Sequence, residues 1–366
     1  MVAVDPSYPL TPLVGFIAAG LLVPVLFSSL IRESWNLGVI FLCFWLICEN
    51  LIFAVNAILW SDNADAKFFV YCEIASHVRI AADIVKPMST LIIMRRLYSI
   101  ASLRPPRLAD QADRRRNSQI EWTLGCIIPV LCAGPFYLAL QGPRYDILQG
   151  FGCSGPTIRA ILPFVVVYPW YILPAVVSVT FYYPSVVMRF YRHGAEVNRF
   201  LHSVESGVSQ VSYIRILALA SIDLVLTLPV SITTVVMLML HMIQIKHPPL
   251  YLSWPTDIVK QSPTIKSWAE LTSASTPGSG LVEVYFVRWT TVLLSVVVFA
   301  ILGLTKGARE LYWSALHTAM RWLGYHRDSP ERSALRSPAL SPIEFNEATM
   351  STEPRSHPSP TNSIAY

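Results

Sequence analysis

Long apolar runs separated by polar segments dominate the chain. The hydrocarbon core of a membrane is about 30 Å thick, so a helix needs about 20 apolar residues to cross it. Seven runs reach that length, at roughly 11–31, 37–60, 68–97, 120–140, 161–191, 214–242 and 284–304. The pattern predicts an all-α membrane protein, a seven-transmembrane helix bundle.

The third run carries several charges within HVRIAADIVKPMSTLIIMRRLYSI, residues 77–100. Arg79, Asp83, Lys86 and Thr90 are spaced by four, three and four residues, so they form one stripe along a helix, the charged stripe. Each Asp, Lys or Arg at the bilayer centre costs about 2.5 to 3.5 kcal/mol. We expect the stripe to face the bundle interior or a wet cavity, with Asp83 pairing with Arg79 and with Lys86.

Other predicted spans offer polar residues to the same interior. They are Glu49, Asn50 and Asn56 in the second span, Asp223 in the sixth and Arg288 in the seventh. Glu49 is a candidate partner of Lys86, because counting at 1.5 Å per residue from opposite membrane faces places both at depths within roughly 5 Å of each other. Several such residues together favour a gated cavity, and the alternative is a set of buried pairs that only fixes helix packing.

Prolines inside the spans predict kinks, because proline lacks an N–H donor and its ring clashes with the preceding turn. Pro87 in the third span and Pro229 in the sixth are the candidates for functional kinks. Asp223 and Pro229 share the sixth span, so we expect this helix to pivot.

Lysine and arginine predict the orientation of the bundle. The segments that follow odd-numbered spans carry most of the arginines, whereas the N-terminal segment has no Lys or Arg. By the positive-inside rule the N-terminus is outside and the C-terminus is cytoplasmic. The net charge of +5 is then explained by topology and gives no reason to propose nucleic acid as a partner. We expect no cleavable signal peptide and expect the first span to act as its own anchor.

The six cysteines divide by their predicted depth. Cys72 lies near the outer end of the third span and Cys153 lies in the outer loop after the fourth, so both face an oxidising compartment. We expect a disulfide between them that ties this loop over the mouth of the bundle. The other four, Cys43, Cys48, Cys126 and Cys132, fall within spans and are expected to pack between helices.

Composition and motifs argue against an enzyme. Hydrophobic residues make up 53% of the chain and charged residues 14%, which is outside the range of ordinary globular domains. The sequence lacks the H-E-x-x-H, G-x-S-x-G and P-loop patterns, and its histidines are scattered. We therefore expect no catalytic activity, no cofactor and no metal site.

The domain organisation follows from where the apolar pattern ends. Residues 1–318 are expected to form the seven-transmembrane domain, and residues 319–366 a disordered cytoplasmic tail rich in Ser and Pro. The long outer connection before the seventh span carries Trp254 and the segment TPGSG, and loops of this length commonly have a function.

Several segments resemble one receptor family. They are RRLYSIAS at 95–102, YIRILALASIDLVLTLPVSI at 213–232, YLSWPTDIV at 251–259, and VRW at 287–289 followed by LGLTKGARELYW. In this order they resemble the fungal lipopeptide mating-pheromone receptors, the a-factor receptor type of class D G protein-coupled receptors. The resemblance covers roughly residues 10–315 and excludes the tail.

The resemblance implies a receptor in the plasma membrane. A secreted peptide with a prenylated, methylated C-terminal cysteine would bind from outside or from the outer leaflet, with its lipid in an apolar cleft between helices. Binding would open the cytoplasmic face to a heterotrimeric G protein. The sequence does not decide whether the receptor forms a dimer. The ligand-binding or switch candidates are Glu49, Asn56, His77, Arg79, Asp83, Lys86, Trp254 and Arg288. The G-protein-facing candidates are Arg95, Arg96, Arg192, Arg199 and Arg215.

Two other classes compete with a receptor. A transporter also places charges at the midplane, but the first and last three spans show no convincing internal similarity. A scaffolding membrane protein would not need the charged stripe. The cytoplasmic arginines have a simpler alternative role as well, since topology and anionic membrane lipids alone can account for them.

Overall fold

The computed structural model describes residues 3–31, 36–101, 111–137, 145–155, 161–189, 192, 210–244, 250, 263–272, 281–305, 308–310 and 312–314. The chain divides into two units, Met1–Leu316 and His317–Tyr366. The second unit lies outside the described residues, so the disordered tail stays a prediction.

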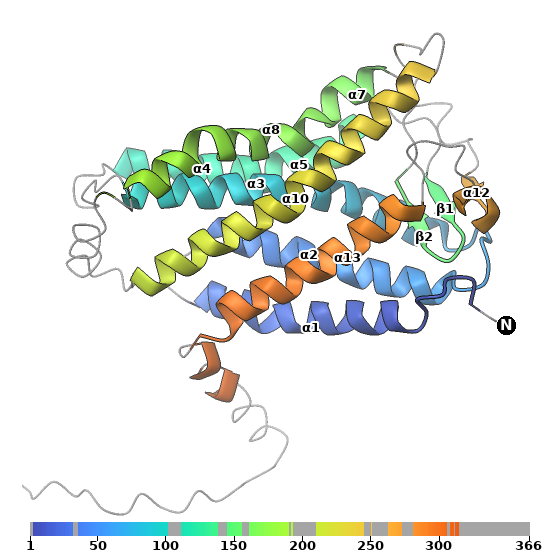
Figure 1. Ribbon diagram of the computed structural model, residues 1–366, viewed down its shortest axis with the longest axis horizontal. Helices are drawn as coiled ribbons and strands as arrows, with labels where there is room; N and C mark the ends of the chain where they lie inside the picture. The colour runs from blue at the N-terminus through green and yellow to red at the C-terminus, as the bar shows by residue number, and fades with distance from the viewer. Residues whose placement is uncertain are drawn as a thin grey trace, which may run out of the picture. The chain divides into compact units, whose positions relative to one another are not determined.

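Seven helical spans make up the first unit (Figure 1). Four are single helices, α1 (Leu10–Ile31), α2 (Leu37–Leu59), α3 (Phe69–Ala101) and α10 (Gln210–Gln244). The fourth span joins α4 (Gln111–Trp122), η2 (Thr123–Ile127), α5 (Ile128–Leu131) and η3 (Cys132–Phe136). The fifth joins α7 (Ile161–Val167), α8 (Pro169–Val177), η4 (Ser178–Tyr182) and a helix at 183–189, and the seventh joins α13 (Leu281–Val298) and η5 (Phe299–Gly303).

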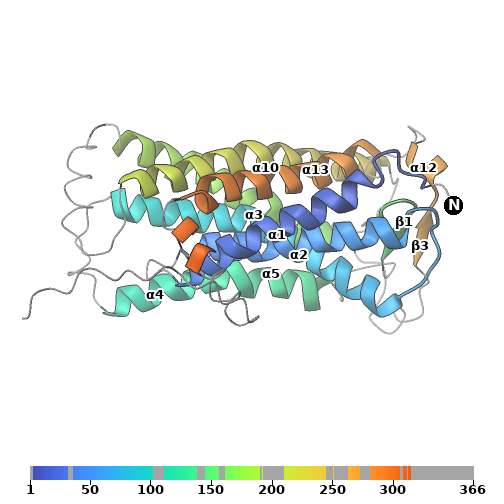
Figure 2. The same ribbon diagram turned by 90° about the horizontal axis from the view of Figure 1, so that it is seen from below.

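The predicted seven-helix bundle is confirmed, and one span differs from the others in composition. Six of the described helices are apolar enough to cross a membrane by sequence alone, and α3 is not among them because of its charges. With 33 residues α3 is about 50 Å long, which is ample to cross. Its position explains how it tolerates the charges, since α3 packs against α2, α5, α8 and α10. Figures 1 and 2 both show it among the other helices.

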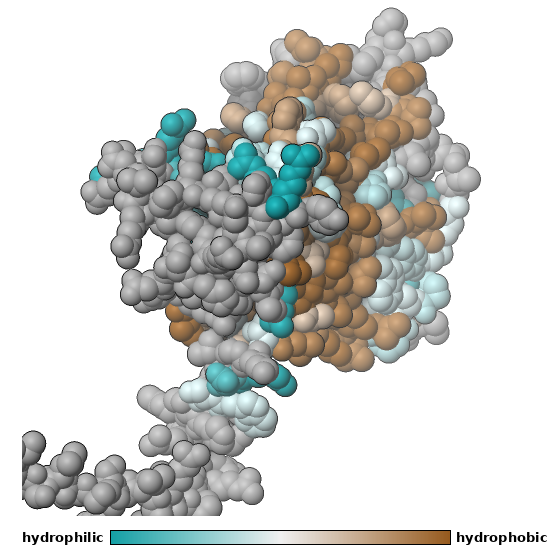
Figure 3. All heavy atoms as spheres, turned by 60° about the vertical axis from the view of Figure 1, so that its left-hand side comes forward, coloured by the Kyte–Doolittle hydropathy of each residue, from teal (hydrophilic) through white to brown (hydrophobic). Residues whose placement is uncertain are grey.

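Apolar side chains from six of the seven spans form the largest buried cluster, in which Val186 represents the fifth span. It includes Leu22, Leu46, Ile93, Leu219 and Leu294, from α1, α2, α3, α10 and α13 respectively. Other large apolar side chains on the same helices are exposed, and Figure 3 shows them as a broad hydrophobic surface. Such a surface is what lipid-facing helices present.

Wide helical turns accompany the prolines of the fourth and fifth spans. The π-helical turn η2 precedes Pro129, η3 contains Pro135, and η4 ends two residues before Pro184. Proline cannot donate to the carbonyl one turn earlier and clashes with it, so an extra residue in the turn gives the ring room. The fourth span therefore stays helical across its prolines, whereas the fifth has a turn at Tyr168, directly before Pro169.

A small sheet covers one end of the bundle, here called the hairpin end. Strands β1 (Asp146–Leu148) and β2 (Gly152–Ser154) pair antiparallel, and β3 (Thr264–Lys266) pairs parallel with β1. The short helix α12 (Trp268–Thr272) follows β3, and Phe151 stacks on Trp268 with ring centres 6.0 Å apart. The start of α1 lies at the same end (Figure 1).

Gly152 lets the hairpin approach α2 closely. Its φ of +77° is left-handed, and a Cβ there would lie 2.7 Å from the Cβ of Asn56 and 2.9 Å from the Trp60 ring. Trp60 is fully buried, so its ring cannot move aside. Only glycine combines this conformation with this approach.

We expect Gly152→Ala to displace the hairpin and to destabilise the protein by about 1 to 3 kcal/mol, because it adds both backbone strain and a clash. Gly20→Ala is the matched control, since a Cβ at Gly20 in α1 meets nothing within 4 Å. It should be neutral or stabilising by up to about 1 kcal/mol. Thermal unfolding of the purified variants measures both, and equal midpoints would contradict the close approach.

Candidate functional site

The predicted disulfide joins α3 to the hairpin. Cys72 and Cys153 are bonded, with their Cα atoms 5.3 Å apart. The four cysteines expected to pack between helices are free: Cys43 and Cys132 are buried, and Cys48 and Cys126 are half-buried. The hairpin is thus fixed over this end of the bundle.

Two polar side chains support the hairpin from below. The Asn56 amide donates to the Cys153 carbonyl at 3.0 Å, and the Arg79 guanidinium donates to the same oxygen at 3.3 Å. The Tyr71 hydroxyl in turn donates to the Asn56 carbonyl oxygen at 2.9 Å. Asn56 is fully buried, so these bonds hold it in one orientation.

The prediction that Arg79 pairs with Asp83 is wrong. The Arg79 guanidinium lies 4.8 Å from the centre of the Phe53 ring and bonds to the Cys153 carbonyl. The spacing of four residues allows the pair along a helix, but the hairpin offers a neutral acceptor and α2 an aromatic face. Arg79 therefore links α2, α3 and the hairpin.

Lys86 forms the ion pairs that the sequence predicts. Its ammonium lies 3.1 Å from each carboxylate oxygen of Glu49 and 2.8 Å from Asp83. Glu49 is fully buried, whereas the Asp83 side chain keeps 28% of its exposure. One ammonium thus serves two carboxylates from α2 and α3, and its three donors suffice for both.

Polar contacts continue from the charged stripe to the sixth and seventh spans. The Thr90 hydroxyl contacts the carboxylate of Asp223, which is 1% exposed on α10. The Asn50 amide donates to the Ser295 hydroxyl at 2.8 Å, which joins α2 to α13. Four spans therefore meet through buried polar groups, and a change in one contact is felt by several helices.

Arg288 joins α13 to α2 and to the N-terminal segment. Its guanidinium donates to the Phe53 carbonyl at 2.7 Å and lies 4.0 Å from the Asp5 carboxylate. The Tyr285 hydroxyl also donates to Asp5, which is 4% exposed. Asp5 was not predicted, because a single acid in a short N-terminal segment has no periodicity that marks it.

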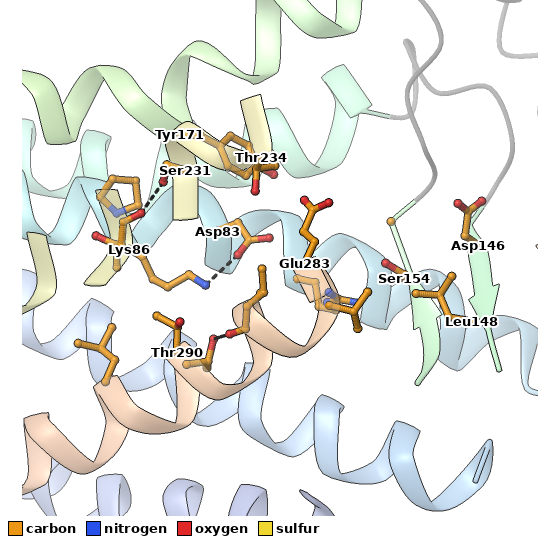
Figure 4. A pocket seen from close by; sticks show the side chains of 18 of the residues that line it. Asp83, Lys86, Asp146, Leu148, Ser154, Tyr171, Ser231, Thr234, Glu283 and Thr290 are labelled. Atoms are coloured by element: carbon orange, nitrogen blue, oxygen red, sulfur yellow. Dashed lines mark hydrogen bonds and ion pairs between the residues drawn. The ribbon is translucent and has the colours of Figure 1, made fainter. Parts of the chain in front are cut away.

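A cavity of about 180 Å³ opens beside the charged stripe, beneath the hairpin (Figure 4). Arg79, Asp83, Lys86 and Pro87 line it from α3, and Tyr171 lines it from α8. The remaining polar walls are Asp146, Ser154 and Lys266 of the sheet, Thr227, Ser231 and Thr234 of α10, and Glu283, Thr290 and Thr291 of α13. Asp146 and Lys266 form an ion pair at 3.0 Å. A polar ligand in this cavity would contact charged side chains that also form ion pairs, such as Asp83 and Lys86.

Not every sequence candidate belongs to this cavity. Glu49 and Arg288 lie behind its walls as partners of other residues. His77 contacts the Ala133 carbonyl and packs edge-on against Tyr137 with ring centres 5.2 Å apart, so it faces the fourth span. It therefore lies outside the cavity lining. Trp254 lies outside the described residues.

Four of the five arginines predicted to face a G protein are among the described residues, and they lie toward the other end of the bundle. Arg95 donates to the Asn117 carbonyl oxygen at 2.6 Å, while Arg96 and Arg215 are half-buried. Arg192 is exposed, and Arg199 lies outside the described residues. Arg189 donates to the Tyr98 hydroxyl at 3.2 Å, which ties the fifth span to α3 at this end.

Residues 10–322 match the STE3 family of pheromone A receptors. The chain belongs to this family. The resemblance seen in the sequence is thereby confirmed, and no finding supports the transporter alternative.

Fungal pheromone receptors resemble the chain over most of its length. It is 30% identical to the "Pheromone B alpha 3 receptor" of Schizophyllum commune over 90% of this chain and 50% of that one. It is 28% identical to "Pheromone receptor 1" of Mycosarcoma maydis, over 83% and 82%. It is 25% identical to the "Pheromone a factor receptor" of Saccharomyces cerevisiae, over 76% and 55%. The chain spans about half the length of the Schizophyllum receptors.

A solved structure shows the same fold. Squid rhodopsin superposes with a TM-score of 0.52 at 14% identity, covering 88% of this chain and 91% of that one. This pheromone A receptor family member is thus a multi-pass membrane protein with the rhodopsin-like seven-helix fold, of a class usually found in the plasma membrane.

Pro229 lies within α10, where its role in bending the helix can be tested. The helix continues through this exposed proline, six residues after Asp223. We expect Pro229→Leu to restore the missing backbone hydrogen bond, to straighten α10 and to change basal signalling at equal surface level. A reporter of G-protein signalling, normalised to surface receptor, measures the change. Unchanged basal and stimulated signals would show that the proline is only architectural.

Proposed function

We propose that this member of the pheromone A receptor family binds a secreted, lipidated peptide pheromone and activates a heterotrimeric G protein at the plasma membrane. One observation carries the proposal: the cavity beneath the hairpin is lined by Asp83 and Lys86, whose stripe continues through Thr90 to Asp223 on α10. A ligand in the cavity would thus act on contacts that hold the bundle together.

The orientation that this function requires has two supports. A disulfide persists in an oxidising compartment, which favours the hairpin end outside the cell. Arg95 and Arg96 of α3 and Arg189 of the fifth span lie toward the other end, which favours that end inside. The peptide would then reach the cavity from outside.

The polar lining of the cavity suggests where the peptide and the prenyl group of the pheromone would each bind. Three acidic and three basic side chains line it, namely Asp83, Asp146, Glu283, Arg79, Lys86 and Lys266. A prenyl chain in the cavity would remove water from these charged groups without pairing with them, which costs free energy. We therefore place the peptide in the cavity and the prenyl group against the apolar, lipid-facing surface of the helices.

The coupling step would be a shift between two arrangements of the same helices. A ligand moves such an equilibrium only by its differential affinity for the two states, typically about 1 to 3 kcal/mol. Rearranged pairs at Lys86 would change how α3 packs against α10, and the G protein would bind near Arg95, Arg96, Arg192, Arg199 and Arg215. Contact with anionic lipids alone is the competing role for these arginines.

Cells that lack other pheromone receptors and carry a G-protein-dependent reporter test the proposal. We expect synthetic peptides ending in S-farnesyl cysteine methyl ester to activate the reporter through this receptor, and the same peptides without the farnesyl group to be at least about tenfold weaker, because lipidation adds membrane affinity. Equal activity of the farnesylated and non-farnesylated peptides would show that the receptor does not require the lipid. No response to any compatible pheromone at normal surface level would reject the receptor function.

A further inference from the structure

Two adjoining cavities form one larger recess beside α3. A second cavity of about 140 Å³ shares Arg79, Asp83, Ser154, Gly155, Tyr171 and Thr234 with the first. It extends toward the fourth and fifth spans, where Tyr137 and Tyr168 line it. The recess therefore has a carboxylate side and an aromatic side.

Two of the three cations that line the recess are already paired with carboxylates. Lys86 is shared between Glu49 and Asp83, and Lys266 is paired with Asp146. Glu283 has no ion pair among the described residues. It accepts a hydrogen bond from the Thr234 hydroxyl, and its charged neighbours include Lys266 and Asp83. Figure 4 shows Asp83 and Glu283 on facing walls of the cavity, from α3 and α13.

The remaining cation of the recess is already engaged. Arg79 donates to the Cys153 carbonyl and lies over the Phe53 ring. Releasing it to neutralise Glu283 would remove a support of the hairpin. The negative charge of Glu283 is therefore the one that a ligand can pair with at least cost to the structure.

Aromatic rings complete a surface that suits a cation. Tyr168 and Tyr171 stack with ring centres 5.2 Å apart, and Tyr171 lines both cavities. Tyr137 is 3% exposed, and its hydroxyl has no hydrogen-bond partner among the described residues. Ring faces attract cations, and an unpartnered buried hydroxyl can accept from a donor that arrives with a ligand.

We propose that Asp83 and Glu283, together with Tyr137, Tyr168 and Tyr171, bind a guanidinium or ammonium group of the peptide ligand. The inference rests on the proposed function, since it names the part of the pheromone that the cavity selects. Charge-assisted hydrogen bonds to the carboxylates fix the cation, and the ring faces favour a cation over a neutral polar group of the same shape. Glu283 becomes a specificity residue of the receptor.

Small probes test the recess without lipid or G protein. We use purified full-length receptor in lipid nanodiscs and measure dissociation constants by ligand-observed NMR. N-acetyl-argininamide, N-acetyl-lysinamide, the neutral isostere N-acetyl-citrullinamide and the acidic N-acetyl-glutamate amide are compared. We expect one of the two cationic probes to bind at about 1 mM, and the neutral and acidic probes to be at least about tenfold weaker. The stronger of the two cationic probes identifies the group.

Variants assign the binding to the recess. Glu283→Gln should weaken the cationic probe at least about tenfold, whereas Glu270→Gln, at an exposed glutamate of α12, should not change it. Tyr171→Phe should bind more tightly than Tyr171→Leu, because only the former keeps a ring. The unfolding midpoint of each ligand-free variant confirms that it is folded.

Three results would overturn the inference. They are failure of both cationic probes to bind at about 20 mM, equal binding of the cationic and neutral probes, and unchanged binding in a folded Glu283→Gln variant. None of these results bears on signalling by the lipopeptide, so the proposed function stands or falls separately.

Discussion

Replacing Lys86 by alanine is expected to cause the largest loss of stability among single substitutions in the charged stripe. The change leaves the fully buried Glu49 carboxylate without its cation, which commonly costs about 3 to 5 kcal/mol. Natural proteins are stable by only about 5 to 15 kcal/mol, so surface expression should fall strongly. Asp83 should contribute less to the loss, because its partly exposed side chain can be solvated.

A double-mutant cycle separates the pair from general damage to α3. If Glu49 and Lys86 are partners, Lys86→Ala combined with Glu49→Gln should be less harmful than Lys86→Ala alone, by about 1 kcal/mol or more. Surface level and G-protein signalling are measured for all four forms. Strictly additive effects would show that the pair has no energetic role. Wild-type behaviour of variants that neutralise Arg79, Asp83 and Lys86 singly would reject the hypothesis that the charged stripe switches the receptor between states.

Breaking the disulfide is expected to have the second largest effect. Cys72→Ser and Cys153→Ser should each lower surface expression and ligand response, because the bond closes a loop of 81 residues. The chain-entropy relation gives about 4 to 5 kcal/mol for such a loop. Part of this chain is confined by the membrane in either state, so we expect about 2 to 4 kcal/mol.

The two serine variants should have the same effect as the double variant, since all three remove one bond. Cys126→Ser, at a free cysteine of η2, is the control that should leave expression unchanged. Peptide mapping without reductant detects the bond directly. Free thiols at both positions in folded receptor would contradict it, and so would a double variant clearly worse than either single one.

The parts of the structure that follow from strong physical costs could be predicted from the sequence. Membrane thickness sets the length of the spans, so their number and approximate bounds follow from hydropathy. The cost of a buried charge forces Lys86 to find an acid, and Glu49 is the acid of the second span at its depth. The pairing of Cys72 with Cys153 follows from the prediction that both lie at the outer, oxidising end.

The remainder of the site depends on tertiary contacts that no periodic pattern marks. Arg79 has an acid four residues away and still binds a carbonyl 74 positions along the chain. Strands of three residues are too short to show alternation, so the sheet that brings Asp146 and Lys266 to the cavity was not predicted. Glu283 lies in the first turn of α13, where an acid also fits a helix N-terminus and gives no sign of a cavity.

Nucleotide exchange by purified components tests the central claim most directly, namely that a lipopeptide in this bundle activates a G protein. Receptor in nanodiscs is mixed with a heterotrimeric G protein, and exchange is followed with and without a farnesylated pheromone peptide. The account predicts that the peptide accelerates exchange by at least about fivefold, which corresponds to an activation free energy lower by about 1 kcal/mol. No acceleration by any peptide that binds the receptor would contradict it.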